Sequence, residues 1–180
     1  MSLTALLLTG CTSSAYQREE DTPTPEEIAH AEAQMRKLPS VEETHQQLTL
    51  VVERIADAAA AIAPELVWEK KLNRTQSPLG CPRAYNKTDG TSKTTDTLIS
   101  PVPISDTAWP PIIDEARRIA AESGITVFTI RFDEPGHHDI TLHSPDQGNQ
   151  INIGTRVASS IRGLTGCRYS AEDLHSAPHP

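Results

Sequence analysis

Residues 40 to 63 contain the pattern that most restricts how this chain can fold. Ser40-Val41-Glu42-Glu43 is a capping box, in which the serine hydroxyl and the second glutamate satisfy backbone N–H groups of the first helical turn. Apolar side chains then recur every three or four residues, at Leu48, Val51, Val52, Ile55, Ala59 and Ile62. Because 3.6 residues complete a turn, they form a single stripe. The segment predicts a long amphipathic helix to about Ala63, with one face against a core.

Two further segments have helical signals. Thr24-Pro25-Glu26-Glu27 predicts a short, mostly polar helix that reaches about Lys37. Ser105-Asp106 predicts the cap of another helix, which ends near Ser123 with Gly124 just beyond it. The apolar stripe of this helix comprises Trp109, Ile112, Ile113, Ala116, Ile119 and Ala120. The chain thus has two main helices that each need a partner for their apolar face.

Short segments of alternating apolar residues complete the pattern. Three consecutive strands are predicted at 125–132, at 138–143 and from Ile151 through Val157, and Ile161 and Leu164 could extend the last one. Pro135-Gly136 predicts a turn between the first and second of these strands, and residues 145–149 predict a turn between the second and third. Residues 66–70 predict an earlier strand with Leu66 and Trp68 on one face, and residues 94–99 an edge strand.

These elements predict an α+β fold, a two-layer sandwich with two main helices packed on a mainly antiparallel four- or five-stranded sheet. Residues 1–10 are interpreted as the remnant of a signal peptide. Residues 11–39 would form a lipidated tether with the short polar helix. Residues 40–167 would form the globular domain, and 168–180 a flexible tail.

Charge and composition exclude several classes of function. With 24 acidic and 16 basic residues, the net charge of −8 disfavours nucleic acid and adsorption to anionic lipid. A hydrophobic fraction of 37% and an aromatic fraction of 4% indicate one modest core with polar ends. No run approaches the ~20 apolar residues that a membrane-spanning helix needs.

The stretch Leu6-Leu7-Leu8-Thr9-Gly10-Cys11 gives the sharpest functional signal. It resembles the lipobox of bacterial lipoproteins, in which a branched apolar residue and two small residues precede a cysteine that becomes the acylated first residue. The residues after Cys11 turn polar at once, unlike a core segment. No Lys or Arg precedes the apolar run, which indicates that the natural start lies upstream. We predict lipidation at Cys11, and acyl chains at about 0.8 kcal/mol per buried CH₂ would hold the protein on a membrane.

The two other cysteines, Cys81 and Cys167, are expected to form a disulfide, because an exported protein meets an oxidising environment. Joining positions so far apart would stabilise the fold by roughly 4–5 kcal/mol in the chain-entropy model. The alternative is a catalytic cysteine, but neither residue lies in a nucleophile motif. The sequence contains no C-x-x-C spacing that would indicate a zinc site.

Other candidates for chemistry are sparse. The polar face of the strand at 138–143 carries His137, Asp139, Thr141 and His143, and His137 and Asp139 could share a metal. A solvent-facing sheet surface explains them better, so we expect no metal and no cofactor. No nucleotide-binding or hydrolase motif occurs. Six aromatic residues could line a ligand cleft: Trp68, Trp109, Phe128, Phe132, Tyr85 and Tyr169. We expect at least the first four of these to lie in the core instead.

The order of these features resembles a known family. The lipobox cysteine and polar spacer precede Ser40-Val41-Glu42-Glu43, then Leu48-Thr49 and Arg54-Ile55-Ala56-Asp57. A strand with Trp68, then Cys81, a helix, strands and Cys167 follow. From about residue 40 to 170 the chain looks like the small mycobacterial lipoproteins of the LppA/LppB/LppV type. The resemblance implies a cell-envelope lipoprotein of pathogenic mycobacteria, with Cys11 as its lipidation site and no catalytic residues to transfer.

We therefore expect a lipid-anchored, non-enzymatic module on the extracytoplasmic face of the cell membrane, which binds or interacts with an unspecified partner. A carrier for a lipid or other apolar ligand is one alternative and would need a cavity between sheet and helices. An enzyme is the other, with its site near the loop at 73–105, since long loops often carry function. The sequence identifies neither ligand nor oligomeric state.

Overall fold

The computed structural model describes residues 22–71, 80–146 and 148–175. Its elements follow the order α1 (Pro25–Met35), α2 (Val41–Ile62), β1 (Glu69–Lys71), the 3₁₀ helix η1 (Arg83–Lys87), β2 (Thr97–Ser100), α3 (Trp109–Ala121), β3 (Val127–Glu134), β4 (His137–His143), β5 (Gln150–Thr155), β6 (Ser159–Leu164) and α4 (Ala171–His175). None of the described helices is both long and apolar enough to cross a bilayer.

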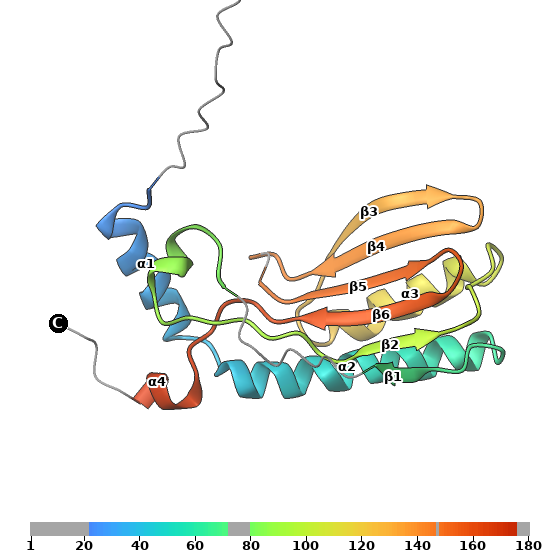
Figure 1. The fold of residues 1–180 in the computed structure, drawn as a ribbon, viewed down its shortest axis with the longest axis horizontal. Coiled ribbons are helices and arrows are strands. Elements are labelled where there is room, and N and C mark those ends of the chain that lie inside the picture. The colour runs from blue at the N-terminus through green and yellow to red at the C-terminus, as the bar shows by residue number, and fades with distance from the viewer. Residues whose placement is uncertain (1–21, 72–79, 147, 176–180) are drawn as a thin grey trace, which may run out of the picture.

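The strands form one antiparallel sheet in the order β1-β2-β6-β5-β4-β3. Figure 1 shows α3 behind the strands and α2 along their lower border, so the two long helices leave one face of the sheet open. The predicted α+β class and antiparallel pairing are confirmed. The sheet has six strands rather than four or five.

The extra strand arises where the sequence suggested one continuous alternation. The chain turns back at 156–158, and Thr155 pairs with Ser159 across this turn. The turn contains neither Gly nor Pro and is closed by a bond from the N–H of Arg156 to the carbonyl of Ala158, at 3.1 Å. Ile161 and Leu164 therefore belong to a separate strand, and Val157, expected in a strand, is 83% exposed at the turn.

Helix α2 begins at its predicted capping box. Ser40 Oγ accepts a bond from the N–H of Glu43 at 3.2 Å, and the Glu43 carboxylate accepts one from the N–H of Ser40 at 3.1 Å. The helix packs closely on β6, because a Cβ atom at Gly163 would lie only 2.7 Å from Cγ of Leu48. A side chain at position 163 would push α2 away from the sheet.

One apolar cluster joins α2, α3 and the inner face of the sheet. Alternate residues of β4 and β5 point into it, including Ile140, Leu142, Ile151 and Ile153, as the period of two predicts. Helix α3 ends as predicted before Gly124, which has a φ of 73°. Of the aromatic residues, Trp109 belongs to the cluster, and Trp68 and Phe128 pack against it. Phe132 is 48% exposed, so its predicted core position is wrong.

Several elements differ from the sequence analysis in a boundary, in a cap or in their place in the sheet. Strand β1 begins at Glu69, after the buried Leu66, and β2 lies between β1 and β6 instead of at the edge. The cap of α3 also differs. The chain makes a turn at 105–108 before the helix starts at Trp109, so the side chain of Asp106 does not cap the helix.

The short N-terminal helix is not merely part of a tether. Helix α1 has the predicted capping box at Thr24 and packs against η1. Its last residue, Met35, is fully buried, and its sulfur would lie 2.5 Å from a Cβ atom at Gly90. The folded part therefore includes residues from about 25 onward, because two apolar side chains of α1, Ala31 and Met35, find cover.

The folded part also continues past Cys167, where the flexible tail was expected to begin. Arg168 and Tyr169 are buried, and residues 171–175 form α4. The backbone at 168 pairs with Thr91, and the N–H of Val41 donates to the carbonyl of Tyr169 at 2.9 Å. The expected start of the tail is therefore wrong for residues 168–175, because this polar segment satisfies its backbone groups against two distant segments.

Candidate functional site

The first predicted site residue, Cys11, lies outside the described residues. The other two are joined, with an S–S distance of 2.10 Å and a Cα–Cα distance of 5.9 Å between Cys81 and Cys167. The bond links the segment before η1 to the segment after β6, the pairing that the sequence analysis expected. A sulfur in a disulfide is not a free nucleophile, so this arrangement is structural.

The polar face of β4 lies where the alternation predicts, with His137, Asp139, Thr141 and His143 half-buried on the outer face. His137 stacks on Phe132 with ring centroids 4.6 Å apart, and His143 Nδ1 lies 3.0 Å from the carbonyl of Ser144. Within residues 22–71, 80–146 and 148–175, no three His, Cys, Asp or Glu side chains gather as metal ligands. The structure thus gives His137 and His143 other contacts.

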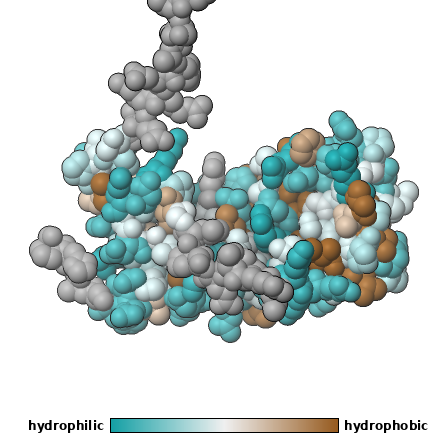
Figure 2. Space-filling model, in the orientation of Figure 1, coloured by the Kyte–Doolittle hydropathy of each residue, from teal (hydrophilic) through white to brown (hydrophobic). Residues whose placement is uncertain are grey.

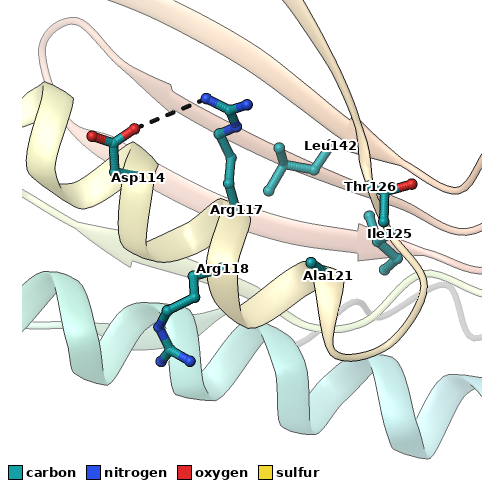
Figure 3. A pocket seen from close by; sticks show the side chains of 7 residues that line it. All are labelled: Asp114, Arg117, Arg118, Ala121, Ile125, Thr126 and Leu142. Carbon is teal, nitrogen blue, oxygen red and sulfur yellow. Dashed lines mark ion pairs between the residues drawn. The ribbon is translucent and has the colours of Figure 1, made fainter.

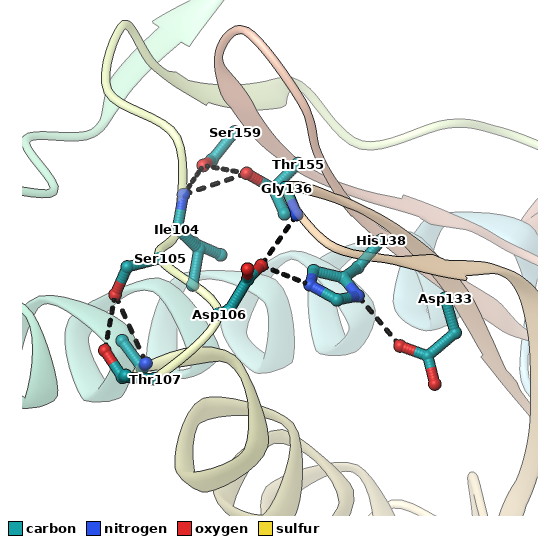
Figure 4. A network of polar contacts seen from close by, with 10 residues as sticks. Ile104, Ser105, Asp106, Thr107, Asp133, Gly136, His138, Thr155 and Ser159 are labelled. Atoms are coloured by element: carbon teal, nitrogen blue, oxygen red, sulfur yellow. Dashed lines mark hydrogen bonds and ion pairs between the residues drawn. The ribbon is translucent and has the colours of Figure 1, made fainter.

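The inner face of β4 holds a histidine that the sequence analysis missed. His138 is buried and stacks on Trp109, with ring centroids 4.8 Å apart. Its Nδ1 lies 2.8 Å from Asp133 and its Nε2 2.9 Å from Asp106, and Asp106 also accepts the N–H of Gly136 at 2.7 Å (Figure 4). The period of two could have placed His138, because it shares a face with Ile140 and Leu142.

This His138 cluster, formed with Asp106, Asp133 and Gly136, is suited to holding the end of the sheet. The N–H of Gly136 and then the His138 ring hold the pKa of Asp106 below its usual value. Both ring nitrogens of His138 face carboxylates, and both contacts are hydrogen bonds only when each nitrogen carries a proton. A general base needs one ring nitrogen free to take up a proton, and in this arrangement each nitrogen of His138 lies against a carboxylate.

A second polar contact ties the same end of the molecule to the sheet. The N–H of Ile104 donates to Thr155 Oγ1 at 2.8 Å and to Ser159 Oγ at 2.9 Å (Figure 4). Ser159 Oγ in turn donates to the carbonyl of Val102 at 2.9 Å. These bonds fix the loop between β2 and α3 beside the β5–β6 turn.

The described surface has one hollow between α3 and the start of β3, with a volume of about 270 Å³. Figure 3 shows Arg117 extending from α3 toward the strands, with Asp114 beside it at 3.9 Å. The guanidinium of Arg117 lies 5.0 Å from the centre of the Phe128 ring, and Arg118 pairs with Glu115 and Glu122. The cations of this hollow already have partners, which leaves little for a ligand to contact.

Another hollow lies on the outer face of the sheet, the face turned to the viewer in Figure 2, where the surface over the strands is mostly teal and white. We name it the outer-face hollow; its volume is about 290 Å³. Five strands contribute its lining: Thr97, Arg131, Asp139, Asn152, Gly154, Ser160 and Arg162. None of the aromatic residues considered above lines it. From the loop at 73–105 it includes only Thr97, and residues 72–79 lie outside the described part.

The fold and these sites define a class: a small α+β domain, closed by one disulfide, whose described hollows each contain arginine and aspartate side chains. A family profile described as LppA, lipoprotein confined to pathogenic Mycobacterium, matches residues 17–171. The chain therefore belongs to the LppA family of lipoproteins, as the sequence resemblance predicted.

Two solved structures have a similar fold. The lipoprotein LppA from Mycobacterium tuberculosis has a TM-score of 0.69 at 18% identity, over 86% of this chain and 94% of that chain. A DUF4853 family protein from Actinomyces odontolyticus has a TM-score of 0.50 at 15% identity, over 80% of this chain and 78% of that chain. No curated protein matches the chain. At these identities the two likenesses establish the fold alone.

Proposed function

We propose that this protein is a cell-envelope lipoprotein, anchored to the membrane by lipid on Cys11, whose α+β domain acts as a binding or interaction module on the extracytoplasmic face. The observation that carries the proposal is the position of the family match. It begins at residue 17, six residues after the Leu8-Thr9-Gly10-Cys11 sequence. A lipobox placed just before a lipoprotein-family domain is where an acylation site belongs.

The direction of the chain supports display away from a membrane. Twelve residues lie between Cys11 and Thr24, the N-cap of α1, and the thirteen Cα–Cα steps from one to the other span at most about 45 Å. In Figure 1 the chain enters α1 at one end of the molecule, and the β3–β4 and β5–β6 turns lie at the other end. An anchor at Cys11 would therefore leave the far end and the open face of the sheet accessible.

Charge supports a covalent anchor over surface adsorption. The net charge of −8 opposes approach to an anionic leaflet, where each Lys or Arg near the surface would contribute about 1 kcal/mol. Acyl chains act through buried CH₂ groups instead and need no basic surface.

The two alternative functions have weaker support. A carrier of apolar ligands needs an apolar cavity, whereas each of the two described hollows contains arginine and aspartate side chains, and apolar residues line only part of the hollow beside α3. An enzyme needs convergent reactive groups. Among the residues that the structure describes, one cluster of titratable groups is centred on a buried histidine, His138, and both of its ring nitrogens lie against carboxylates.

Metabolic labelling tests the anchor. The precursor with its full leader, expressed in a mycobacterial host, should incorporate labelled palmitate and sediment with membranes, and Cys11→Ala should abolish both. The matched control is Cys81→Ser with Cys167→Ser, which removes the other two thiols and should keep the label. Undiminished labelling of Cys11→Ala would overturn the proposal.

A further inference from the structure

The outer-face hollow contains two arginines that have no ion pair within the described part of the chain, Arg131 and Arg162. Elsewhere the basic side chains of Arg54, Lys70, Lys93 and Arg118 each lie within 2.8 Å of a carboxylate. In a chain with 24 acidic residues, two guanidiniums that form no ion pair share a hollow with a single carboxylate, that of Asp139, so cations outnumber anions there and favour a negatively charged group. The planar fork of arginine matches the two oxygens of a carboxylate or phosphate.

The backbone brings the two arginines to one hollow. The register of β3 against β4 shifts between Ile130 and Phe132, so Arg131 is the extra residue of a bulge, and bulges re-aim side chains. Arg162 stands on β6, paired with Asn152 of β5. Strands β3 and β6 are three strand spacings apart, about 14 Å, a gap that two long side chains can close from both sides.

Gly154 keeps the space between the arginines open. It pairs with Asp139 on one side and Ser160 on the other, at the middle of the hollow. A Cβ atom at Gly154 would lie 3.7 Å from Oδ2 of Asp139, in ordinary contact, so a larger side chain there would fill the hollow without straining the strand.

Asp139 gives the hollow an acceptor beside the two cations. Its Oδ1 is shielded from solvent and has no hydrogen-bond partner. An acceptor left in this state costs free energy, and a donor from a ligand would recover it once the carboxyl group turns Oδ1 toward the hollow. Asn152, Ser160 and Thr97 add amide and hydroxyl groups around the same space.

We propose that the outer-face hollow binds a small ligand that carries a carboxylate or phosphate group next to a hydroxyl or amine. The oxyanion contacts Arg131 and Arg162, and the neighbouring donor bonds to Asp139. The volume of about 290 Å³ is near the lower end for ligand sites, about 300 Å³, and so limits the ligand to a small molecule. This assignment rests on the proposed binding function and names its ligand class.

Titrations of the full chain carrying Cys11→Ala, followed by amide NMR, test the site without acylation. The probes are glycerol 3-phosphate, methyl phosphate, glycerate and glycerol, up to about 10 mM. We expect glycerol 3-phosphate, glycerate or both to shift the amides of Asn152 and Gly154 saturably, while glycerol does not. The member of the pair that binds more tightly identifies the oxyanion as phosphate or carboxylate. Absence of saturable binding by both would overturn the proposal.

Three variants in the hollow and one control variant assign the contacts. Arg131→Gln and Arg162→Gln should each weaken binding about tenfold or more, whereas Arg156→Gln, an exposed arginine at the β5–β6 turn, should leave it unchanged. Glycerol 3-phosphate should bind more tightly than methyl phosphate, which lacks hydroxyls, and Asp139→Ala, which removes the acceptor, should abolish this preference. Equal weakening by all three arginine variants would mean non-specific charge and would contradict a site. Because acylation plays no part here, failure of this test leaves the labelling result intact, and failure of labelling leaves this one intact.

Discussion

The two ends of the molecule are held together by different means. The end containing α3, β3, β4 and most of α2 is built on one apolar cluster that joins both long helices to the sheet. The end containing α1, η1 and α4 contributes only a few buried apolar side chains, such as Met35 and Tyr169, none of them in that cluster. It is joined instead by the disulfide and by bonds between distant backbone segments. We call these the core end and the disulfide end.

The difference shows how a chain with a low apolar content extends its fold beyond its core. At the disulfide end a single glutamate, Glu42, links three segments: it pairs with Lys93 at 2.8 Å and accepts the N–H of Ala171 at 3.0 Å. Arg36 lies over the ring of Tyr169 at 5.1 Å. Such contacts are individually weak, so a covalent link across them has a large effect on local stability.

The largest expected effect is loss of the disulfide. Cys81→Ser with Cys167→Ser should lower the free energy of unfolding by about 4–5 kcal/mol, from loop entropy over a sequence separation of 86. Urea denaturation measures this loss. Hydrogen exchange should increase first in α1, in 80–95 and in 164–170, while the core end stays protected. Reductant should reproduce the effect in the parent and leave the variant unchanged. An equal increase in hydrogen exchange at the core end and the disulfide end would contradict the view that the two ends are stabilised by different means.

A substitution in the core end should act on the whole molecule. Ile153→Ala removes a fully buried side chain of β5 and should lower the free energy of unfolding by about 3 kcal/mol, through lost burial and a cavity. The matched control is Ile130→Ala on β3, which is 54% exposed and should change stability by less than about 0.5 kcal/mol. Similar losses from the two substitutions in urea denaturation would contradict the assignment of the core.

The smallest expected effect concerns the polar contact at the core end. Because the folded-state pKa of Asp106 lies below its usual value, its contribution to stability is present above about pH 4 and is lost as the pH falls through that lower pKa. Asp106→Asn should therefore flatten the decline in stability below about pH 4. Urea midpoints measured from pH 6 to pH 2 give the dependence of stability on pH. An unchanged dependence in the variant would show that the Gly136 N–H and His138 do not stabilise the Asp106 carboxylate.

The core end could largely be predicted from the sequence, because its residues repeat with the period of helix or strand. The stripe from Leu48 to Ala59 and the alternation in β4 and β5 each reflect one buried face, although Ile62, predicted to be part of the stripe, is 39% exposed at the end of α2. Even there the alternation concealed the β5–β6 turn, which has no Gly or Pro to mark it. The alternation does place His138 on the inner face, but a polar residue at an inward position was not recognised as part of a cluster.

The disulfide end and the outer-face hollow could not be predicted in the same way. Arg168 and Tyr169 look like a polar tail in the sequence, and their burial depends on pairing with Thr91 and Val41, far away in the chain. The two arginines of the hollow are 31 positions apart, and only the bulge and the order of four strands bring them to one surface. The local periodicity of the sequence predicts neither the burial of Arg168 and Tyr169 nor the proximity of the two arginines.

The 22 residues of α2 give it a length of about 33 Å, and it runs along the longest dimension of the molecule in Figure 1. It therefore works as a fixed spacer: its first turn belongs to the end where the chain enters, and its last turn lies beside the loops at the opposite pole. Those loops expose Val67, Val102 and Val157. A partner that contacts these valines would approach from the end of the molecule opposite α1. Helix α2 would keep the distance between this contact surface and the disulfide constant.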